Sequence, residues 1–479
     1  MSIQMSFCPF RFLLALLLLS PALKAAKPCT VEGYAKGFEG QLISLHTYEE
    51  YITLAERKLG ETVVETDGHF EITYEAEGVE RVFVRYAKLR GFFFAEPGRL
   101  VRILCPPRDS ARMVNMDVEY EIELTCFTED STDMNFLAID FNTNFQKFWN
   151  KNFSYFVDKN SYHKLDSFHI AMRKHYAFVK NPYFMPWMDF SFASIEDATF
   201  HPEKKLAKNY LIGKPIYYAN NEYMNFFNNF FEQYMYMGSI RKEGAGIGAA
   251  INQWVSYDSL MSAMKPLRWL ANDTLRELVM LKGLFECYHN PAFIPRNILS
   301  VAQQTASRSR VPQHREIARR IVAFYTKLKA GSMAAHFEAI DKSGKSIDPI
   351  AEFAGKPVYL FFFSEWNTNA QNEMRLMSEL HKRYGKKMTF VAVSIGNDTL
   401  AWKKFLRENP KYNWVMLHYN FDERIKEAYS IYATPVGFLI DEEGRLLAAP
   451  ADLPSGGVLE PQIYKLLNPR AAPLRVGER

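Results

Sequence analysis

The sequence predicts a multidomain protein with an N-terminal small antiparallel β-sandwich, a middle all-α domain and a C-terminal α/β domain. Three changes of pattern along the 479 residues predict this order. Apolar and polar residues alternate in the first part, apolar residues recur at helical spacing in the middle, and strand-like and helix-like runs alternate in the last third. A chain of this length also exceeds what a single hydrophobic core usually organises.

Residues 1–26 are predicted to be a secretory signal peptide. Arg11 precedes an apolar run from Phe12 to Leu19, and the small residues Ala25 and Ala26 follow it. The run is shorter than the roughly 20 apolar residues that a membrane-spanning helix needs. We therefore expect an exported protein of the periplasm or cell envelope, without a transmembrane segment.

Residues 27–110 are predicted to form the β-sandwich. Strand-like runs begin at Gln41, Thr62, His69 and Arg81, and a further run leads to the turn Pro97-Gly98. Several of these runs alternate apolar and polar residues, as half-buried strands do. Asp67-Gly68, between the second and third runs, is typical of a tight hairpin turn.

Residues 111–330 are predicted to form the all-α domain. Thr274 and Glu277 have the spacing of a capping box, which predicts a helix that begins there and stops at Asn290-Pro291. A second helix is expected from Ile317 to Leu328. An aromatic stripe at three- and four-residue spacing predicts a buried helix face, with a sugar- or peptide-binding face as the alternative; it comprises Tyr223, Phe226, Phe227, Phe230, Phe231 and Tyr234.

Residues 331–479 are predicted to form the α/β domain. Its central strand is expected at Val358–Phe363, because that run is entirely apolar. The remaining elements expected from the sequence are a helix at Glu373–Tyr384, a strand at Met388–Ile395, a helix at Leu400–Glu408, a hairpin of Gly437–Asp441 with Arg445–Ala448, and a helix at Leu459–Leu467.

Four cysteines remain after the predicted signal peptide, namely Cys29, Cys105, Cys126 and Cys287. No two of them form a C-x-x-C pair, so the spacings for dithiol catalysis and for zinc ligation are both missing. Cys105 and Cys126 each end a strand-like run. Either a disulfide joins them or both are separate buried thiols, because unpaired cysteine behaves as a small hydrophobic residue.

Charge and motif content exclude several classes of function. The formal charge is only +4, and the basic residues are dispersed among acidic ones, so we expect no nucleic-acid partner. The glycines of Gly244–Gly248 match no phosphate-loop spacing. His163, His169 and His175 fall six residues apart, which does not place them on one helix face. We therefore predict no cofactor and no metal.

The C-terminal region resembles the exported thioredoxin-like proteins of the TlpA type from Gram-negative bacteria. The resemblance rests on Gly355-Lys-Pro-Val followed by the apolar strand, on Ser364-Glu-Trp366, and on Thr434-Pro435 followed by a hairpin. Ala335–Gly344 is similar to the opening hairpin of that family. The resemblance implies a thioredoxin fold, with a cis bond before Pro435.

The same resemblance implies two redox cysteines, but these positions fall on Asn367 and Ala370. No cysteine follows Cys287, so we expect a domain without thiol–disulfide activity. Asn367 is a strong helix N-cap residue, and that structural role is one reading of it. The other reading keeps the family groove as a peptide-binding surface, formed by Trp366, Asn367, Thr368, Asn369, Thr434 and Pro435.

Two functions follow from these readings. The preferred one is a redox-inactive protein- or peptide-binding or scaffold module in the cell envelope, with no catalytic residue. The alternative is a thiol–disulfide oxidoreductase that uses a cysteine from outside the domain, for which Cys287 is the candidate. The position of Cys287 relative to Trp366 and Pro435 discriminates between them.

Overall fold

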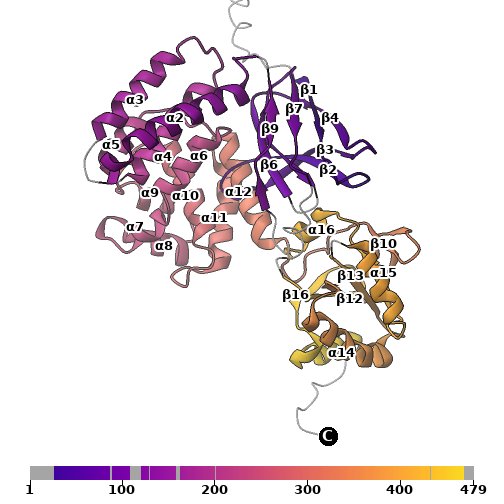
Figure 1. Cartoon of the computed structure of the whole chain (residues 1–479). Coiled ribbons are helices and arrows are strands. Elements are labelled where there is room, and N and C mark those ends of the chain that lie inside the picture. Colours follow the sequence, from indigo (N-terminus) through magenta and orange to yellow (C-terminus); the bar gives the residue numbers. More distant parts are fainter. Residues whose placement is uncertain are drawn as a thin grey trace, which may run out of the picture.

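The computed structural model describes residues 26–86, 89–107, 120–128, 130–157, 162–199, 201–396, 398–431 and 433–468. It has an N-terminal β-rich region, a middle helical region and a C-terminal α/β region (Figure 1). The predicted signal peptide lies outside the described residues except for Ala26. No helix among the described residues has both the length and the apolar character needed to span a membrane.

The β-rich region consists of two sheets that share one hydrophobic core. One sheet has the order β4-β1-β7-β9 and the other the order β3-β2-β5-β6-β8. Inward-facing residues of both sheets, such as Val31 and Val84, are fully buried in this core. The strands are β1 (Lys27–Tyr34), β2 (Leu42–Tyr48), β3 (Glu56–Val63), β4 (His69–Ala76), β5 (Glu80–Tyr86), β6 (Leu89–Ala95), β7 (Leu100–Leu104), β8 (Tyr120–Ile122) and β9 (Thr125–Phe127).

Three details of the β-rich region differ from the sequence prediction. The sheets are not purely antiparallel, because β1 pairs in parallel with β7 and β6 pairs in parallel with β8. The Asp67-Gly68 turn forms, with Gly68 at φ 88°, but it leads β3 of one sheet into β4 of the other and makes no hairpin. The region also continues past residue 110, because β8 and β9 complete its sheets.

The helical region extends from Met134 to Thr326. Its longest helix, α2, is followed by packed pairs of shorter helices. The elements are α2 (Met134–Val157), α3 (Tyr162–His175), α4 (Phe184–Ala198), α5 (Glu203–Leu206), the π-helix η2 (Ala207–Leu211), α6 (Asn221–Phe230), α7 (Tyr234–Ser239), the 3-10 turn η3 (Lys242–Gly244), α8 (Gly246–Asn252), α9 (Tyr257–Met264), α10 (Asp273–Glu286), α11 (Pro295–Arg308) and α12 (Pro312–Thr326).

Two sequence interpretations in the helical region need correction. The capping box is wrong: the N-cap of α10 is Asn272, whose Oδ1 accepts a hydrogen bond from the Leu275 amide at 2.9 Å. The aromatic stripe is divided between two helices, because Gln233 adopts a left-handed conformation between α6 and α7. Most of the stripe, including Tyr223 and Phe227, is buried in the helical core, which agrees with the core reading.

The α/β region is built on a seven-stranded mixed sheet with the order β11-β10-β14-β13-β12-β15-β16. Strands β12, β13 and β14 are parallel, and β15 runs antiparallel to β12. Its elements are β10 (Ala339–Asp341), β11 (Ser346–Ile347), α13 (Pro349–Glu352), β12 (Val358–Phe363), α14 (Thr368–Tyr384), β13 (Thr389–Ser394), α15 (Thr399–Glu408), β14 (Val415–His418), α16 (Glu423–Ala428), β15 (Val436–Ile440), β16 (Leu446–Ala451), the 3-10 turn η4 (Pro454–Gly456) and α17 (Leu459–Leu467).

Helices cover both faces of this sheet. Ala370 and Met374 of α14, Phe405 of α15 and Ile463 of α17 pack on one face. Ile425 of α16 belongs to the cluster on the opposite face. Every residue of β12 is buried, as the apolar run predicted for a central strand.

The β-rich and helical regions pack directly against each other, and the α/β region lies beside the β-rich region (Figure 1). Asn135 of α2 and Phe94 of β6 exchange two hydrogen bonds of 2.7 Å through the Asn135 side chain and the Phe94 backbone. Arg320 of α12 forms an ion pair with Glu49. The first two regions therefore share polar as well as apolar contacts.

Candidate functional site

The candidate site lies where β12 passes into α14. The chain leaves the buried strand at Phe363 and turns through Ser364, Glu365 and Trp366 before α14 begins at Thr368. Asn367 is the N-cap, with φ −80° and ψ 106°. Its Oδ1 accepts hydrogen bonds from the amides of Asn369 at 2.9 Å and Ala370 at 3.2 Å. The capping role expected from the sequence is therefore present.

Asn367 has a second contact, which the sequence did not predict. Its Nδ2 donates a hydrogen bond to the carbonyl oxygen of Thr434 at 2.7 Å. The hydroxyls of Ser364 and Thr434 lie 3.3 Å apart. The peptide bond between Thr434 and Pro435 is cis, as the resemblance implied. The structure therefore brings the two predicted halves of the groove, Trp366–Asn369 and Thr434-Pro435, to the same place.

The predicted site residues differ in accessibility. The Trp366 side chain is 62% exposed, and Thr368 and Asn369 are also exposed. Asn367, Thr434 and Pro435 are half-buried. Ala370 is fully buried in the core cluster beneath α14. The Trp366 ring is therefore the large exposed apolar group of the candidate groove. Ala370 instead packs in the core beneath α14.

A buried polar cluster lies beneath the turn and was missed by the sequence analysis. The Glu365 side chain is 8% exposed and accepts a hydrogen bond from the Ser394 hydroxyl. The Gly396 amide donates to the same hydroxyl at 3.2 Å. A Cβ at Gly396 would lie 2.0 Å from Glu365 Oε2, so a larger residue there would force the Glu365 carboxyl group to move. Burial raises the pKa of Glu365.

His418 completes this cluster at the end of β14. Its Nε2 donates to the carbonyl oxygen of Gly396 at 2.9 Å, and its Nδ1 accepts from the amide of Asn420 at 3.0 Å. Both bonds together require the neutral Nε2–H tautomer. Burial of the ring lowers its pKa to about 4. The sequence contained a signal for this cluster. Its members Glu365, Ser394 and His418 lie at or just after the carboxyl ends of the parallel strands β12, β13 and β14, and these ends meet at one edge of the sheet.

The structure places Cys287 away from this groove. Cys287 follows α10 and is 2% exposed in the core of the helical region, in a cluster whose described members all belong to the β-rich and helical regions. Burial raises the pKa of its thiol to about 12. The groove itself has no thiol of its own, because no cysteine occurs in the sequence after Cys287.

Cys105 and Cys126 are both free thiols, so the structure contains no disulfide between them. Cys105 follows β7 and is 1% exposed, and Cys126 lies on β9 opposite Ile103. Burial raises the pKa of each thiol to about 12. Cys105 is buried in the core of the β-rich region, and the half-buried Cys126 packs against that core.

Comparison with known proteins agrees with this geometry. A protein-family model described as Thioredoxin-like matches residues 355–446. The thiol-disulfide oxidoreductase ResA of Bacillus thuringiensis subsp. konkukian is 29% identical over 122 residues, which cover 25% of this chain and 69% of that protein. ResA of Bacillus subtilis is 27% identical over 142 residues, which cover 29% of this chain and 75% of that protein.

Among solved structures, a putative thiol-disulfide oxidoreductase from Bacteroides vulgatus is 30% identical; the match covers 29% of this chain and 99% of that one, with a TM-score of 0.28. The residues that the family model matches lie in the C-terminal part of the chain. The C-terminal region is a thioredoxin-like domain, and its relatives include thiol-disulfide oxidoreductases.

Proposed function

We propose that this protein is exported and that it binds a protein or peptide in the cell envelope. Because its C-terminal region is a thioredoxin-like domain without cysteines at the redox positions, we also propose that it lacks thiol–disulfide activity. One observation carries the proposal. At the N-terminus of α14, where the resemblance places the first redox cysteine, stands the amide of Asn367, which is engaged with Thr434 and with the helix end.

The chemistry of exchange supports the redox-inactive part of the proposal. Thiol–disulfide exchange needs a thiolate that attacks and a second thiol that resolves the mixed disulfide. Asn367 and Ala370 supply neither group. The hydroxyl of Ser364 is no substitute, because it is 3% exposed and hydroxyl oxygens do not form disulfides.

The position of Cys287 argues against the alternative oxidoreductase. A borrowed cysteine has to reach the groove and ionise there. Cys287 instead packs in the helical core with a pKa raised to about 12 by burial. Bringing it to Trp366 would require unfolding of the end of α10.

The binding part of the proposal rests on the exposed surface beside the groove. Trp366 presents a large aromatic ring to solvent, and such rings are favoured in protein recognition because they bury much area. The Thr434 carbonyl, which strand pairing with a peptide would use, already accepts the Asn367 amide proton. We therefore assign the main contact to the Trp366 ring and treat backbone pairing at Thr434 as secondary.

A binding experiment with a thiol-free polypeptide tests this assignment. The probe is dye-labelled insulin B chain with its cysteines carboxymethylated, so that no disulfide can form, and the readout is fluorescence anisotropy. We expect saturable binding by the full-length protein and a loss of at least about tenfold in affinity in Trp366→Ala, as for a central aromatic contact.

Trp254 provides a matched control, because it is 60% exposed, as Trp366 is 62% exposed, but lies in the helical region. Trp254→Ala should bind the probe as the wild type does. Absence of binding by the wild type, or equal binding by wild type and Trp366→Ala, would contradict a peptide-binding groove.

The exported location rests on the predicted signal peptide of residues 1–26. Expression of the full-length chain in a Gram-negative host, followed by fractionation and mass spectrometry, tests it. We expect a processed protein in the periplasmic or envelope fraction. A full-length protein that stays in the cytosol would contradict export.

A further inference from the structure

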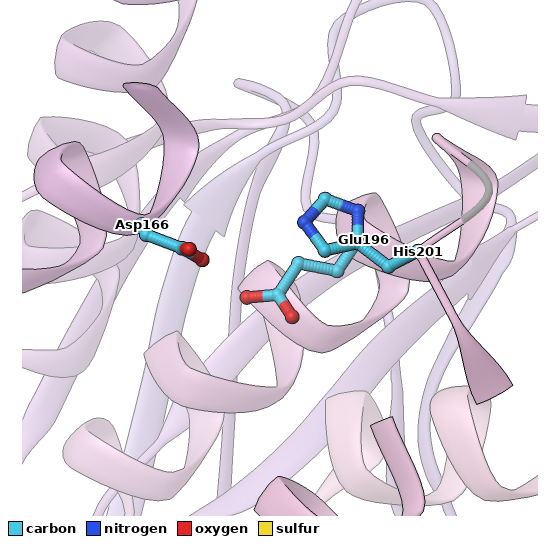
Figure 2. Close-up of side chains that lie close together, drawn as sticks. All are labelled: Asp166, Glu196 and His201. Carbon is cyan, nitrogen blue, oxygen red and sulfur yellow. The ribbon is translucent and has the colours of Figure 1, made fainter. Parts of the chain in front are cut away.

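Three ligand-type side chains converge within the helical region, far in sequence from the groove. They are Asp166 of α3, Glu196 of α4 and His201 just after α4 (Figure 2). One carboxylate oxygen from each acid and one imidazole nitrogen all lie within 4.8 Å of one another. Glu196 and His201 are 2% and 5% exposed, so two of the three side chains are buried.

The local fold holds the His201 ring in a defined orientation. The amide of His201 donates to the carbonyl oxygen of Glu196 at 3.0 Å, which folds the chain back over the end of α4. The Thr199 hydroxyl donates to the Ile195 carbonyl at 2.8 Å and lies 3.2 Å from His201 Nδ1. When this hydroxyl gives its one proton to the Ile195 carbonyl, Nδ1 donates to the hydroxyl oxygen, and the lone pair of the ring is then on Nε2. Neutral imidazole with a hydrogen-bonded second nitrogen is the form in which histidine binds metals.

Glu196 has one buried carboxylate oxygen that a bound cation would satisfy. Its Oε1 accepts a hydrogen bond from the Tyr210 hydroxyl at 2.8 Å. Its Oε2 is buried and has no hydrogen-bond partner among the residues that the structure describes. A buried carboxylate oxygen without a donor is costly, and a bound cation removes that cost.

A cation of the protein itself stands at the edge of the cluster. Lys205 Nζ lies 3.0 Å from both carboxylate oxygens of Asp166. The Lys205 and Asp166 side chains are 35% and 41% exposed, so the ammonium group can move into solvent. Lys205 neutralises Asp166 and competes with any metal ion for it.

We propose that Asp166, Glu196 and His201 bind one divalent transition-metal ion of the zinc class, and that Lys205 is the competing internal cation. Two carboxylate oxygens and one imidazole nitrogen suit zinc better than they suit calcium or magnesium, which prefer all-oxygen sites. Three protein ligands leave a coordination position for water. The site is separate from the Trp366 groove, so its failure and that of the proposed function are independent.

Metal titration of the full-length protein tests the site. The protein is first dialysed against a chelator, and Zn²⁺ binding is then measured by calorimetry, with Co²⁺ absorption as a report on coordination. We expect one Zn²⁺ per chain in the wild type, with Mg²⁺ far weaker. Asp166→Asn, Glu196→Gln and His201→Asn should each lose at least about tenfold in affinity, since each removes a ligand.

Lys205→Gln distinguishes a metal site from a plain ion pair. Removal of the competing ammonium should increase Zn²⁺ affinity, whereas every ligand substitution decreases it. His169→Asn is the matched control, because His169 pairs with Asp189 at 2.9 Å between the same two helices, α3 and α4. This variant should bind Zn²⁺ as the wild type does.

Thermal unfolding gives a second readout if a ligand variant folds poorly. Zn²⁺ should raise the unfolding temperature of the wild type and of Lys205→Gln, because a ligand that binds only the folded state stabilises it. The proposal is overturned if the wild type binds no stoichiometric Zn²⁺, if His201→Asn binds it equally well, or if Lys205→Gln weakens binding.

Discussion

The side-chain nitrogen of Asn367 lies 2.7 Å from the carbonyl oxygen of Thr434, and this bond ties the start of α14 to the residue before the cis-proline. The same side chain caps the helix through its oxygen. One amide therefore meets two structural needs at the place where the family resemblance implies a redox thiol. This double contact explains why an amide suits this position better than a hydroxyl or a methyl group.

Substitutions of Asn367 should separate its two contacts. Asn367→Ser keeps a capping oxygen but cannot reach Thr434, so we expect a loss of about 1 kcal/mol in the free energy of unfolding. Asn367→Ala removes both contacts and should lose about 2 kcal/mol. Urea denaturation of the full-length protein measures both values. Equal stability of Asn367→Ser and the wild type would show that the Thr434 bond contributes nothing.

The stability of the protein should fall in acid because of His418. Burial lowers its pKa from the ordinary 6.5 to about 4, and Lys426 adds to the effect. The unfolded chain therefore binds a proton at His418 more readily than the folded protein does. Neutral His418 stabilises the folded protein above about pH 6.5, and this stabilisation is lost as the pH falls toward 4. The pKa shift corresponds to a change of roughly 3 kcal/mol in the free energy of unfolding.

Comparison with His418→Gln isolates this contribution. The other buried histidines, such as His46, are unchanged in the variant and affect both proteins equally. We expect the free energy of unfolding of the wild type to fall more steeply between pH 7 and pH 4 than that of the variant. Parallel pH curves would show that His418 does not titrate as the structure implies.

Glu277 should matter through its hydrogen-bond partners rather than as part of a capping box. It accepts hydrogen bonds from His314, Tyr257 and Ser309. Burial alone would raise the pKa of Glu277, but these bonds together lower it. Glu277→Ala leaves the partners unpaired and should cost about 3 kcal/mol of stability.

The two N-terminal positions of α10 provide the control for that prediction. Thr274→Ala should change stability by less than about 0.5 kcal/mol, whereas Asn272→Ala should cost about 1 kcal/mol. Urea denaturation again measures these values. A larger loss of stability in Thr274→Ala than in Asn272→Ala would support the capping box that the sequence predicted.

The described cysteines should be unreactive in the native protein. Burial raises the pKa of Cys29 to about 11 and that of Cys105, Cys126 and Cys287 to about 12. At pH 8 a thiol with a pKa of 12 is ionised to about one part in ten thousand, and only the thiolate reacts.

Ellman's reagent measures this reactivity in a Cys8→Ser background. We expect slow labelling of the native protein and rapid labelling of all four thiols in guanidinium chloride. A fast-reacting native thiol that disappears in Cys287→Ser would support the borrowed-cysteine alternative.

Local patterns predicted much of the α/β region. The apolar run Val358–Phe363 is β12 with the expected bounds, and Leu459–Leu467 is α17. The predicted hairpin corresponds to β15 and β16. The helix predicted from Glu373 in fact begins at Thr368, because Asn367 caps it where no apolar periodicity marks its start. These elements are predictable because each depends on its own burial pattern and turn residues.

Long-range pairing could not be read from the sequence in the same way. The turn at Asp67-Gly68 is local and forms, but which sheet receives β4 depends on packing across the whole β-rich region. Glu277 was assigned to its own helix, although its partners include His314 on α12. The cluster of Asp166, Glu196 and His201 has no recognisable spacing, because its members come from different elements.

The central claim is the absence of thiol–disulfide activity, and catalysis of insulin reduction by dithiothreitol tests it most directly. The assay compares three proteins that all carry Cys8→Ser. They are the otherwise wild-type protein, N367C/A370C and the matched control N367S/A370S. We predict that the wild type and the serine variant precipitate insulin no faster than dithiothreitol alone, and that the cysteine variant accelerates it. Acceleration by the wild type itself would contradict the account.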